Sequence, residues 1–306
     1  MTSHIPLSDT VEIRVPLQGI AVFPAGLPRI PGGWTEREWV IEGRSFRLIL
    51  PATPDAFLDD ADVHAAFERD EYMPYWAYLW PASLKMAATV LRSAWPREAD
   101  VLELGCGIGV VGLAGLTQGL NVTFSDYEPV AVELAVMNAR RAGYSNAQGL
   151  VFDWRQPPNR KFSLIWGCEL LYEDRNHQPL LCLLRQLLAP EGKVWFVDGG
   201  RMHAEAFWKM IPTWGLSCQL FDENFQTLAA PRVGKYQLFE IRHAWCGHTG
   251  HHLLDDRDLA TSELTRFAAA GGSAVVELTC EGIAPDPAGL AEVAKRTGLH
   301  IIAGSG

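Results

Sequence analysis

The segment Val101-Leu-Glu-Leu-Gly-Cys-Gly-Ile-Gly109 carries the clearest structural signal in this chain. A short apolar run, typical of a buried strand, is followed at once by three glycines at alternate positions. Glycines directly after a strand let the backbone approach a ligand closely, and the N–H groups at the start of the next helix point towards that ligand. The turn alone is ambiguous, because Gly107-Ile-Gly-Val-Val-Gly112 also matches the GxGxxG pattern of dinucleotide-binding folds.

Strand and helix patterns alternate around this turn. Short apolar runs predict strands at residues 100–104 and 121–125 and buried strands at 149–153, 162–167 and 193–198. Helical spacing predicts helices at about residues 82–94, 108–119, 129–143, 178–188 and 203–212. Two strand patterns, at 216–222 and 234–242, then follow with no helix between them, which indicates an antiparallel hairpin. The predicted fold is α/β, with a mainly parallel sheet covered by helices on both faces and closed by this hairpin.

Polar residues follow three of the predicted strands at the edge where ligands bind in such sheets. Asp126 closes the second strand, where a carboxylate accepts hydrogen bonds from two ribose hydroxyls of either NAD or S-adenosylmethionine. Glu103 precedes the glycines and would face the pyrophosphate of NAD, so it better suits a ligand with an amino group. Asp153 offers a carboxylate to an adenine amino group, and Trp154 offers an indole to cover the ring.

These residues resemble a known family. The 101–109 segment, Asp126, the Asp153-Trp154 pair and the terminal hairpin are similar to the seven-stranded class I S-adenosylmethionine-dependent methyltransferases, whose sheet is Rossmann-like. The upstream segment PYWAYLWPAS at 74–83 and Glu169-Leu-Leu-Tyr172 resemble the methyltransferase 16 group of protein methyltransferases, many of which modify lysine. The resemblance covers about residues 35–242. It implies S-adenosylmethionine as cofactor and a protein lysine as the methyl acceptor.

The resemblance also implies roles for individual residues. Trp80 is expected near the methionine end of the cofactor, Asp126 at the ribose and Cys168 beside the sulfonium. The complete set of residues expected to bind the cofactor is Trp80, Glu103, Gly105, Cys106, Gly107, Gly109, Asp126, Asp153, Trp154 and Cys168. Trp80 also lies in a run with Tyr75, Trp76 and Tyr78, so it is equally compatible with simple packing.

Glu169 and Tyr172 are implied to face the methyl acceptor. Glu169 is expected to orient the acceptor amine and help pass its proton to water, and Tyr172 to wall the channel. Glu169 stands where Asp is more usual in the group, which shifts the acceptor pocket. The alternative is that Glu169 is a solvated loop acid and Tyr172 a core-capping aromatic residue. His177 and His203 are expected to be surface residues without a role.

Composition excludes several classes of protein. The 306 residues include 26 Lys+Arg and 36 Asp+Glu, for a net charge of −10, and contain no dense basic block, so a nucleic-acid partner is not expected. No apolar run is long enough to span a bilayer, and the N-terminus lacks a signal-peptide pattern, so a cytoplasmic protein without a membrane partner is expected. The six cysteines are scattered, which indicates reduced thiols. The oligomeric state is not indicated.

The sequence is interpreted as three parts. Residues 1–71 form an N-terminal β extension that ends in a polar, acidic stretch without a predicted element, 72–243 form the methyltransferase domain, and 244–306 form a fragment of a different α/β unit. The last part, from about residue 253, resembles an early portion of the phosphotriesterase-related amidohydrolase barrels. It lacks their HxH metal-binding pair, since His248, His251 and His252 make only H-x-x-H-H, so neither a metal site nor hydrolase activity is expected.

Other functions remain open at this level. A methyltransferase acting on a small molecule, on a nucleic acid or on a protein residue other than lysine shares the scaffold, because fold and cofactor motif do not fix the acceptor. An NAD-dependent oxidoreductase is disfavoured by Glu103 and by the hairpin. A non-catalytic binding protein with a relic cofactor site is the remaining alternative.

Overall fold

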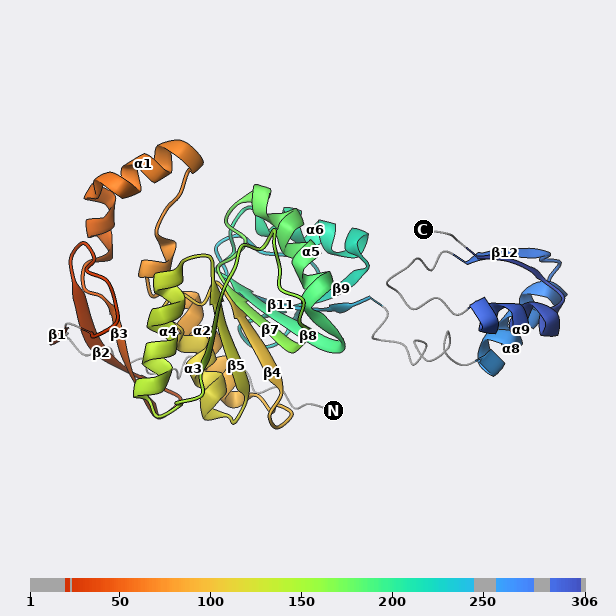
Figure 1. Cartoon of the computed structure of the whole chain (residues 1–306), viewed down its shortest axis with the longest axis horizontal. Coiled ribbons are helices and arrows are strands. Elements are labelled where there is room, and N and C mark those ends of the chain that lie inside the picture. Colours follow the sequence, from red (N-terminus) through yellow and green to blue (C-terminus); the bar gives the residue numbers. More distant parts are fainter. Residues whose placement is uncertain (1–19, 23, 245–256, 278–286, 304–306) are drawn as a thin grey trace. The chain divides into compact units, whose positions relative to one another are not determined.

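The computed structural model describes residues 20–22, 24–244, 257–277 and 287–303 (Figure 1). The chain divides into two compact units, Met1–Ala244 and Trp245–Gly306. Part of the expected N-terminal β extension, including the alternating run Val11-Glu-Ile-Arg-Val15, lies outside the described residues. Two of the six cysteines and the histidines at 248, 251 and 252 do so as well.

An eight-stranded sheet in the order β10-β9-β11-β8-β7-β4-β5-β6 forms the centre of the first unit. Its strands are β4 (Asp100–Leu104), β5 (Asn121–Asp126), β6 (Gln148–Val151), β7 (Phe162–Cys168), β8 (Leu188–Asp198), β9 (Leu216–Asp222), β10 (Thr227–Leu228) and β11 (Gln237–His243). The strands β4 to β8 pair in parallel, and β11 pairs antiparallel with both β8 and β9. The predicted α/β fold with a terminal antiparallel hairpin is confirmed. The second strand of the hairpin, β11, is the one that lies next to β8.

The order of the strands creates a crevice beside β4. The chain runs outward from β4 to β5 and β6, and then returns to place β7 on the other side of β4. The loops after β4 and β7 therefore diverge at the carboxyl edge of the sheet, which is where ligands bind in open α/β folds.

Helices cover both faces of the sheet because neighbouring residues of each strand point to opposite sides. Val101 of β4 packs in one core with α2 (Pro81–Arg92), α3 (Val110–Thr117) and α4 (Pro129–Arg141). Leu102 packs in the other core with α5 (His177–Leu187) and α6 (Ala204–Met210). Short 3₁₀ helices complete the unit: η1 (Pro54–Asp59), η2 (Tyr75–Ala77), η3 (Asp174–Asn176) and η4 (Ile211–Trp214).

One strand differs from its prediction. The run at 149–153 was expected to be buried, but β6 ends at Val151, whose side chain is 47% exposed. β6 is the edge of the sheet, so it has a strand neighbour on one side. Apolar composition alone does not distinguish an edge strand from a central one, because that difference depends on the order of the strands.

An antiparallel sheet of β1 (Ile20–Val22), β2 (Trp34–Ile41) and β3 (Arg44–Pro51) precedes the main sheet and shares its core. The fully buried Asn138 of α4 joins the two sheets. Its side chain exchanges hydrogen bonds with the backbone N–H and C=O of Ile49 at 2.8 and 3.0 Å and donates to the C=O of Ile108 at 3.1 Å. The N-terminal sheet is thereby fixed to the glycine turn.

The acidic stretch before residue 72 contains a helix that the sequence analysis did not predict, α1 (Ala61–Asp70). The carboxylate of Asp60 caps it by accepting hydrogen bonds from the N–H groups of Asp62 at 3.0 Å and Val63 at 3.2 Å. The helix ends at Glu71, which has a left-handed backbone with φ of 55°. None of its residues is buried, so the helix lacks a strongly apolar face, whereas its cap was readable from the sequence.

In the second unit, the helices α8 (Arg257–Ala269) and α9 (Pro287–Thr297) accompany two parallel strands, β12 (Ala274–Glu277) and β13 (His300–Ala303). An ion pair of 2.8 Å between Arg257 and Glu292 joins the two helices. No helix in the described part of the chain is long and apolar enough to cross a membrane. Within the same residues, no cluster of three or more His, Cys, Asp or Glu side chains has the arrangement of a metal site.

Candidate functional site

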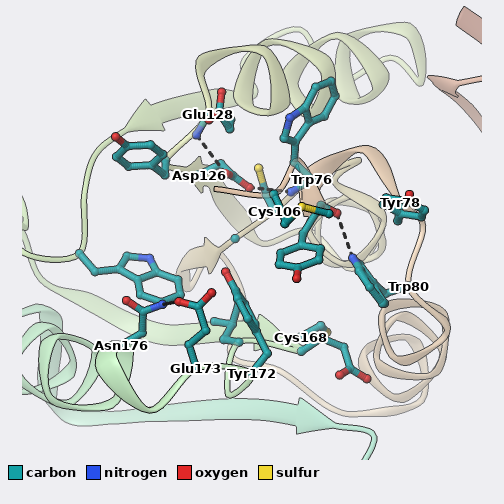
Figure 2. Close-up of a pocket in the computed structure, with 18 of the residues that line it drawn as sticks. Trp76, Tyr78, Trp80, Cys106, Asp126, Glu128, Cys168, Tyr172, Glu173 and Asn176 are labelled. Atoms are coloured by element: carbon teal, nitrogen blue, oxygen red, sulfur yellow. Dashed lines mark hydrogen bonds between the residues drawn. The ribbon is translucent and has the colours of Figure 1, made fainter. Parts of the chain in front are cut away.

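A cavity of about 300 Å³ lies at the carboxyl edge of the sheet (Figure 2). The segments after β4, β5, β6 and β7 line it, together with the segment from α1 to α2. All the residues predicted for the cofactor and acceptor sites line this one cavity: Trp80, Glu103, Gly105, Cys106, Gly107, Gly109, Asp126, Asp153, Trp154, Cys168, Glu169 and Tyr172. The structure therefore brings together residues that are up to 92 positions apart, from Trp80 to Tyr172.

The glycine turn after β4 has a backbone that other residues rarely adopt. Gly105 and Gly109 have φ of +60° and +83°. A Cβ atom on Gly109 would lie 2.6 Å from the Cβ of Ala135 in α4, so this position also lacks room for a side chain. The turn stays compact and leaves the start of α3 open to the cavity.

Asp126 connects the end of β5 with this turn. Its Oδ2 atom accepts the N–H of Gly107 at 3.0 Å, and its Oδ1 atom accepts the N–H of Glu128 at 3.1 Å. Burial raises the pKa of Asp126 to about 6, against the lowering effect of these backbone hydrogen bonds. Because a carboxylate has about four acceptor positions, both oxygens keep acceptor capacity for the two hydroxyls of a ribose.

Glu103 is 4% exposed and reaches the helix that follows the turn. Its Oε2 atom accepts the N–H of Gly112 in α3 at 2.9 Å. Burial raises the pKa of this carboxyl group to about 8, and the hydrogen bond from Gly112 opposes that effect. The carboxyl group thus fixes the first turn of α3 while lining the cavity, and its predicted contact with an amino group stays a prediction.

The end of the cavity that is predicted to hold the adenine contains the indole ring of Trp154 and an ion pair between Asp153 and Arg155. The half-buried Trp154 packs on the core that contains α5. The Oδ1 atom of Asp153 accepts the backbone N–H of Arg155 at 2.8 Å and its guanidinium at 3.3 Å. Arg155 in turn donates to the side chain of Asn176 at 3.2 Å.

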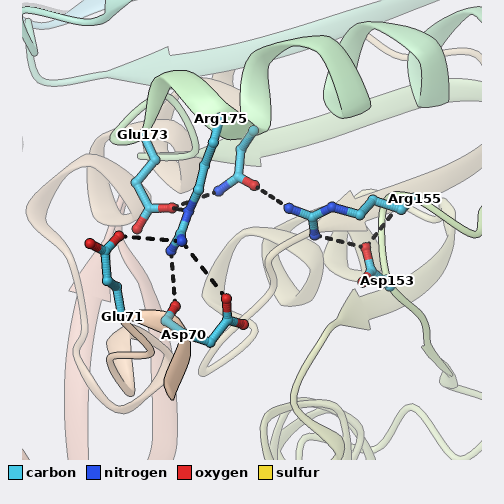
Figure 3. Close-up of polar contacts among 7 residues, drawn as sticks. Asp70, Glu71, Asp153, Arg155, Glu173 and Arg175 are labelled. Carbon is cyan, nitrogen blue, oxygen red and sulfur yellow. Dashed lines mark hydrogen bonds and ion pairs between the residues drawn. The ribbon is translucent and has the colours of Figure 1, made fainter. Parts of the chain in front are cut away.

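Ion pairs link this end of the cavity to the C-terminal end of α1 (Figure 3). The guanidinium of Arg175 contacts the carboxylates of Glu173 at 2.6 Å, Glu71 at 3.3 Å and Asp70 at 3.8 Å. Glu173 also accepts a hydrogen bond of 3.1 Å from Asn176. Two segments about a hundred residues apart in the sequence therefore meet at the cavity.

Trp80, Tyr172 and Cys168 also line the cavity and lie farther from Asp126 in Figure 2 than Trp76 and Cys106 do. Tyr75 makes edge-on ring contacts with Trp80 and with Tyr172, at centroid distances of 6.0 and 5.1 Å. The indole N–H of Trp80 donates to the C=O of Tyr75 at 3.0 Å. Cys168 lies 3.1 Å from the sulfur of Met86, and burial raises the pKa of its thiol, so the thiol stays neutral.

Glu169 has an unusual backbone and a charged partner. Its φ is +56°, in the left-handed region that costs a non-glycine residue about 1–2 kcal/mol. Its carboxylate accepts a hydrogen bond of 2.7 Å from Nε of Arg201, and its side chain is only 9% exposed. Burial raises the pKa of Glu169, whereas Arg201 lowers it. The alternative of a solvated loop acid is therefore wrong.

Tyr172 lies in the cavity wall, where burial raises the pKa of its hydroxyl to about 12. The phenol therefore stays protonated at neutral pH and can donate a hydrogen bond.

Two residues that were not predicted from the sequence contribute to the site: Arg201 lines the cavity, and Asn138 hydrogen-bonds to the glycine turn. Arg201 lines the cavity directly after Gly199-Gly200, at the end of β8, and this glycine-flanked position at a strand end was its only sequence signal. Asn138 had no signal beyond its place in a predicted helix.

The prediction that His177 is a surface residue is wrong. The His177 side chain is 1% exposed and packs edge-on against Phe207 at a centroid distance of 5.3 Å. It occupies the inner face of α5, which the position of a helix start in the sequence does not reveal. His203 is half exposed, as predicted, and contacts Asp174 at 2.9 Å.

Comparison with known proteins finds a family model that resembles each part of the chain. A family model described as "Lysine methyltransferase" matches residues 76–213, and the "Phosphotriesterase family" model matches residues 250–306. The EEF1A lysine methyltransferase 3 of Mus musculus is 31% identical over 167 residues, which are 51% of this chain and 67% of that protein.

A relative with a different named activity also matches. The N-acetyltaurine hydrolase of Salmo salar is 34% identical over 82 residues, which are 26% of this chain and 24% of that protein. The chain thus spans about a quarter of this relative. Among solved structures, a TehB-like S-adenosylmethionine-dependent methyltransferase from Corynebacterium glutamicum is 17% identical, with a TM-score of 0.43, over 62% of this chain and 100% of that one.

Proposed function

The chain belongs to the lysine methyltransferase family of S-adenosylmethionine-dependent methyltransferases, and from this premise we propose that it methylates the ε-amino group of a lysine in a protein. One observation carries the choice of acceptor. The buried carboxylate of Glu169 lines the same cavity as the aromatic rings of Trp80 and Tyr172 and as the glycine turn and Asp126. An anionic group beside aromatic faces suits an amine that arrives as a cation. The named activity of the mouse relative also supports a protein lysine.

We assign the activity to residues 72–243, with 1–71 as an N-terminal β extension and 244–306 as a separate phosphotriesterase-like fragment. The chemistry that S-adenosylmethionine supplies is a methyl group on a positively charged sulfur. Asp126 would accept the ribose hydroxyls, Asp153 and Trp154 would hold the adenine, and the glycine turn with Glu103 and Cys106 would surround the methionine part. These residues fit the cofactor because both Asp126 oxygens keep free acceptor positions inside the cavity.

The chain's own residues prepare the acceptor. A lysine ammonium must lose a proton before its nitrogen has a free electron pair, and the buried Glu169 accepts a hydrogen bond from that nitrogen and relays the proton to water. Tyr172 remains protonated, because burial raises its pKa to about 12, and it orients the nitrogen through its hydroxyl. Trp80 excludes water from the path of the methyl group, so alignment supplies most of the rate.

The experiment is transfer of a tritiated methyl group into a proteome extract, with Glu169→Gln compared with the wild type. We expect labelled protein bands whose intensity drops by about a hundredfold or more in the variant. Glu205→Gln, an exposed carboxylate on α6, is the matched control and should label normally. Bands that persist in Glu169→Gln would remove this residue from the mechanism.

Two further outcomes separate the competing functions. Label that appears only in the low-mass fraction would assign the enzyme to a small-molecule acceptor. Calorimetry with S-adenosylmethionine and with NAD tests the cofactor directly, and binding of NAD alone would contradict the proposed chemistry.

A further inference from the structure

The side chain of Arg201 occupies a site that has the parts of a cation-binding cage. Its guanidinium carbon lies 5.5 Å from the ring centroid of Trp80 and 5.9 Å from that of Tyr172. Its Nε atom donates to the carboxylate of Glu169 at 2.7 Å. Two aromatic faces and one carboxylate around a single cation stabilise the charge from several sides.

The backbone of Arg201 is held in place, whereas its side chain has a route outward. The buried Asp198 accepts the N–H groups of Gly200 at 2.7 Å and of Arg201 at 2.8 Å through Oδ1. The C=O of Gly200 accepts the N–H of Gly234 at 2.8 Å. The Arg201 side chain is nevertheless 34% exposed, against 9% for that of Glu169. Rotation of the side chain therefore frees the cage without a change in the loop.

We propose that the guanidinium of Arg201 occupies the place of the cationic side chain of the methyl acceptor. When the acceptor binds, its side chain displaces the guanidinium from the cage formed by Glu169, Trp80 and Tyr172. This inference rests on the proposed function, which supplies the identity of the acceptor cation, the primary ammonium of a lysine side chain. A compact ammonium can enter such a cage, because it binds the faces of aromatic rings and a carboxylate as a guanidinium does. A neutral side chain has no advantage there, because it leaves Glu169 unpaired and buried.

The test measures binding of a small probe, independently of the methyl acceptor. The probe is n-butylammonium chloride, and 1-butanol is its neutral counterpart. Binding is followed through the ¹⁵N indole signal of Trp80, which is assigned with the variant Trp80→Phe. The proteins are the full-length wild type, Arg201→Ala, Arg201→Gln, and Lys209→Ala as a charge-matched control. Lys209 is an exposed cation on α6 that pairs with Glu205 at 2.6 Å.

We expect both Arg201 variants to bind n-butylammonium at least about tenfold more tightly than the wild type, because the competing internal cation is gone. Lys209→Ala should match the wild type, and 1-butanol should show no such difference. Equal affinities of the wild type and the Arg201 variants for n-butylammonium would overturn the proposal, as would equal affinities for the two probes.

A measurement on the wild type covers the case in which the variants fail to fold. The Arg201 Nε–H signal should move towards that of an exposed guanidinium as n-butylammonium is added, and a signal that stays unchanged at saturation contradicts the displacement. Calorimetry with S-adenosylmethionine shows which of the two proposals fails. Absence of S-adenosylmethionine binding would contradict the proposed function. Binding of S-adenosylmethionine without a preference for the cationic probe would contradict only the role of Arg201.

Discussion

Asp126, at the end of β5, accepts the backbone N–H of Gly107 at 3.0 Å, so one carboxylate both fixes the glycine turn and lines the cavity. The turn and the predicted ribose site are therefore a single unit. A change at Asp126 acts on both, and the two effects are separable by experiment.

Asp126→Asn should weaken binding of S-adenosylmethionine by about a hundredfold or more. The amide keeps one oxygen but loses the charge, and hydrogen bonds to a charged group are worth about 1.5–3 kcal/mol each. Isothermal titration calorimetry measures the change. Asp222→Asn is the control, because the Asp222 carboxylate accepts the N–H groups of Asn224 and Gln226, both at 2.9 Å, in a turn outside the cavity. Similar losses in both variants would mean that Asp126 acts only through the fold.

Binding of the cofactor should depend on pH through the same carboxyl group. Burial raises the pKa of Asp126 to about 6, so the ionised acceptor form is lost as the pH falls through that value. We expect the affinity for S-adenosylmethionine to fall between about pH 7 and about pH 5. An affinity that is flat over this range in the wild type would show that Asp126 accepts no hydrogen bond from the cofactor.

Glu103 should make the free energy of unfolding of the free protein fall as the pH rises. This is the opposite of the pH dependence expected for cofactor affinity. Burial raises the pKa of Glu103 from 4.5 to about 8, so the folded state binds the proton more tightly than the unfolded state. This stabilising contribution is complete below the unfolded pKa and is lost as the pH rises to about 8. Glu103→Gln keeps an oxygen for the N–H of Gly112 and removes the titration. Urea unfolding at about pH 6 and about pH 8 should show a smaller loss of stability in Glu103→Gln than in the wild type, and parallel losses would refute the assignment.

The left-handed backbone of Glu169 predicts an ordering of two variants. Glycine adopts a φ of +56° freely, so Glu169→Gly should be more stable than Glu169→Ala by about 1 kcal/mol, although both lose the carboxylate. Denaturant unfolding gives the difference. Glu173, at the same pocket, has an extended backbone with φ of −136°, and there the alanine variant should be the more stable. The same order at both sites would remove the backbone explanation.

Several parts of the site were predictable because their signals are local. The glycines of the turn follow a buried strand directly, and Asp126 follows the next strand. Parallel strands bring such positions to one edge of the sheet, so twelve residues chosen from the sequence line one cavity.

Other features had no local signal. The exposure of β6 depends on its place at the edge of the sheet, and the burial of His177 depends on the face of α5 that meets Phe207. The helix α1 was missed because none of its residues is buried in the core, although its Asp60 cap was present in the sequence.

Periodicity, glycine positions and strand-end carboxylates were sufficient to infer the α/β sheet, its closing hairpin and the cofactor edge, because each depends on residues that are neighbours in the chain. The pairing of Glu169 with Arg201 spans 32 positions, and the contacts of Asn138 with Ile49 span 89. Such contacts arise only when strands and helices pack. Long-range packing therefore placed the cation of Arg201 beside Glu169 and joined the N-terminal sheet to the glycine turn.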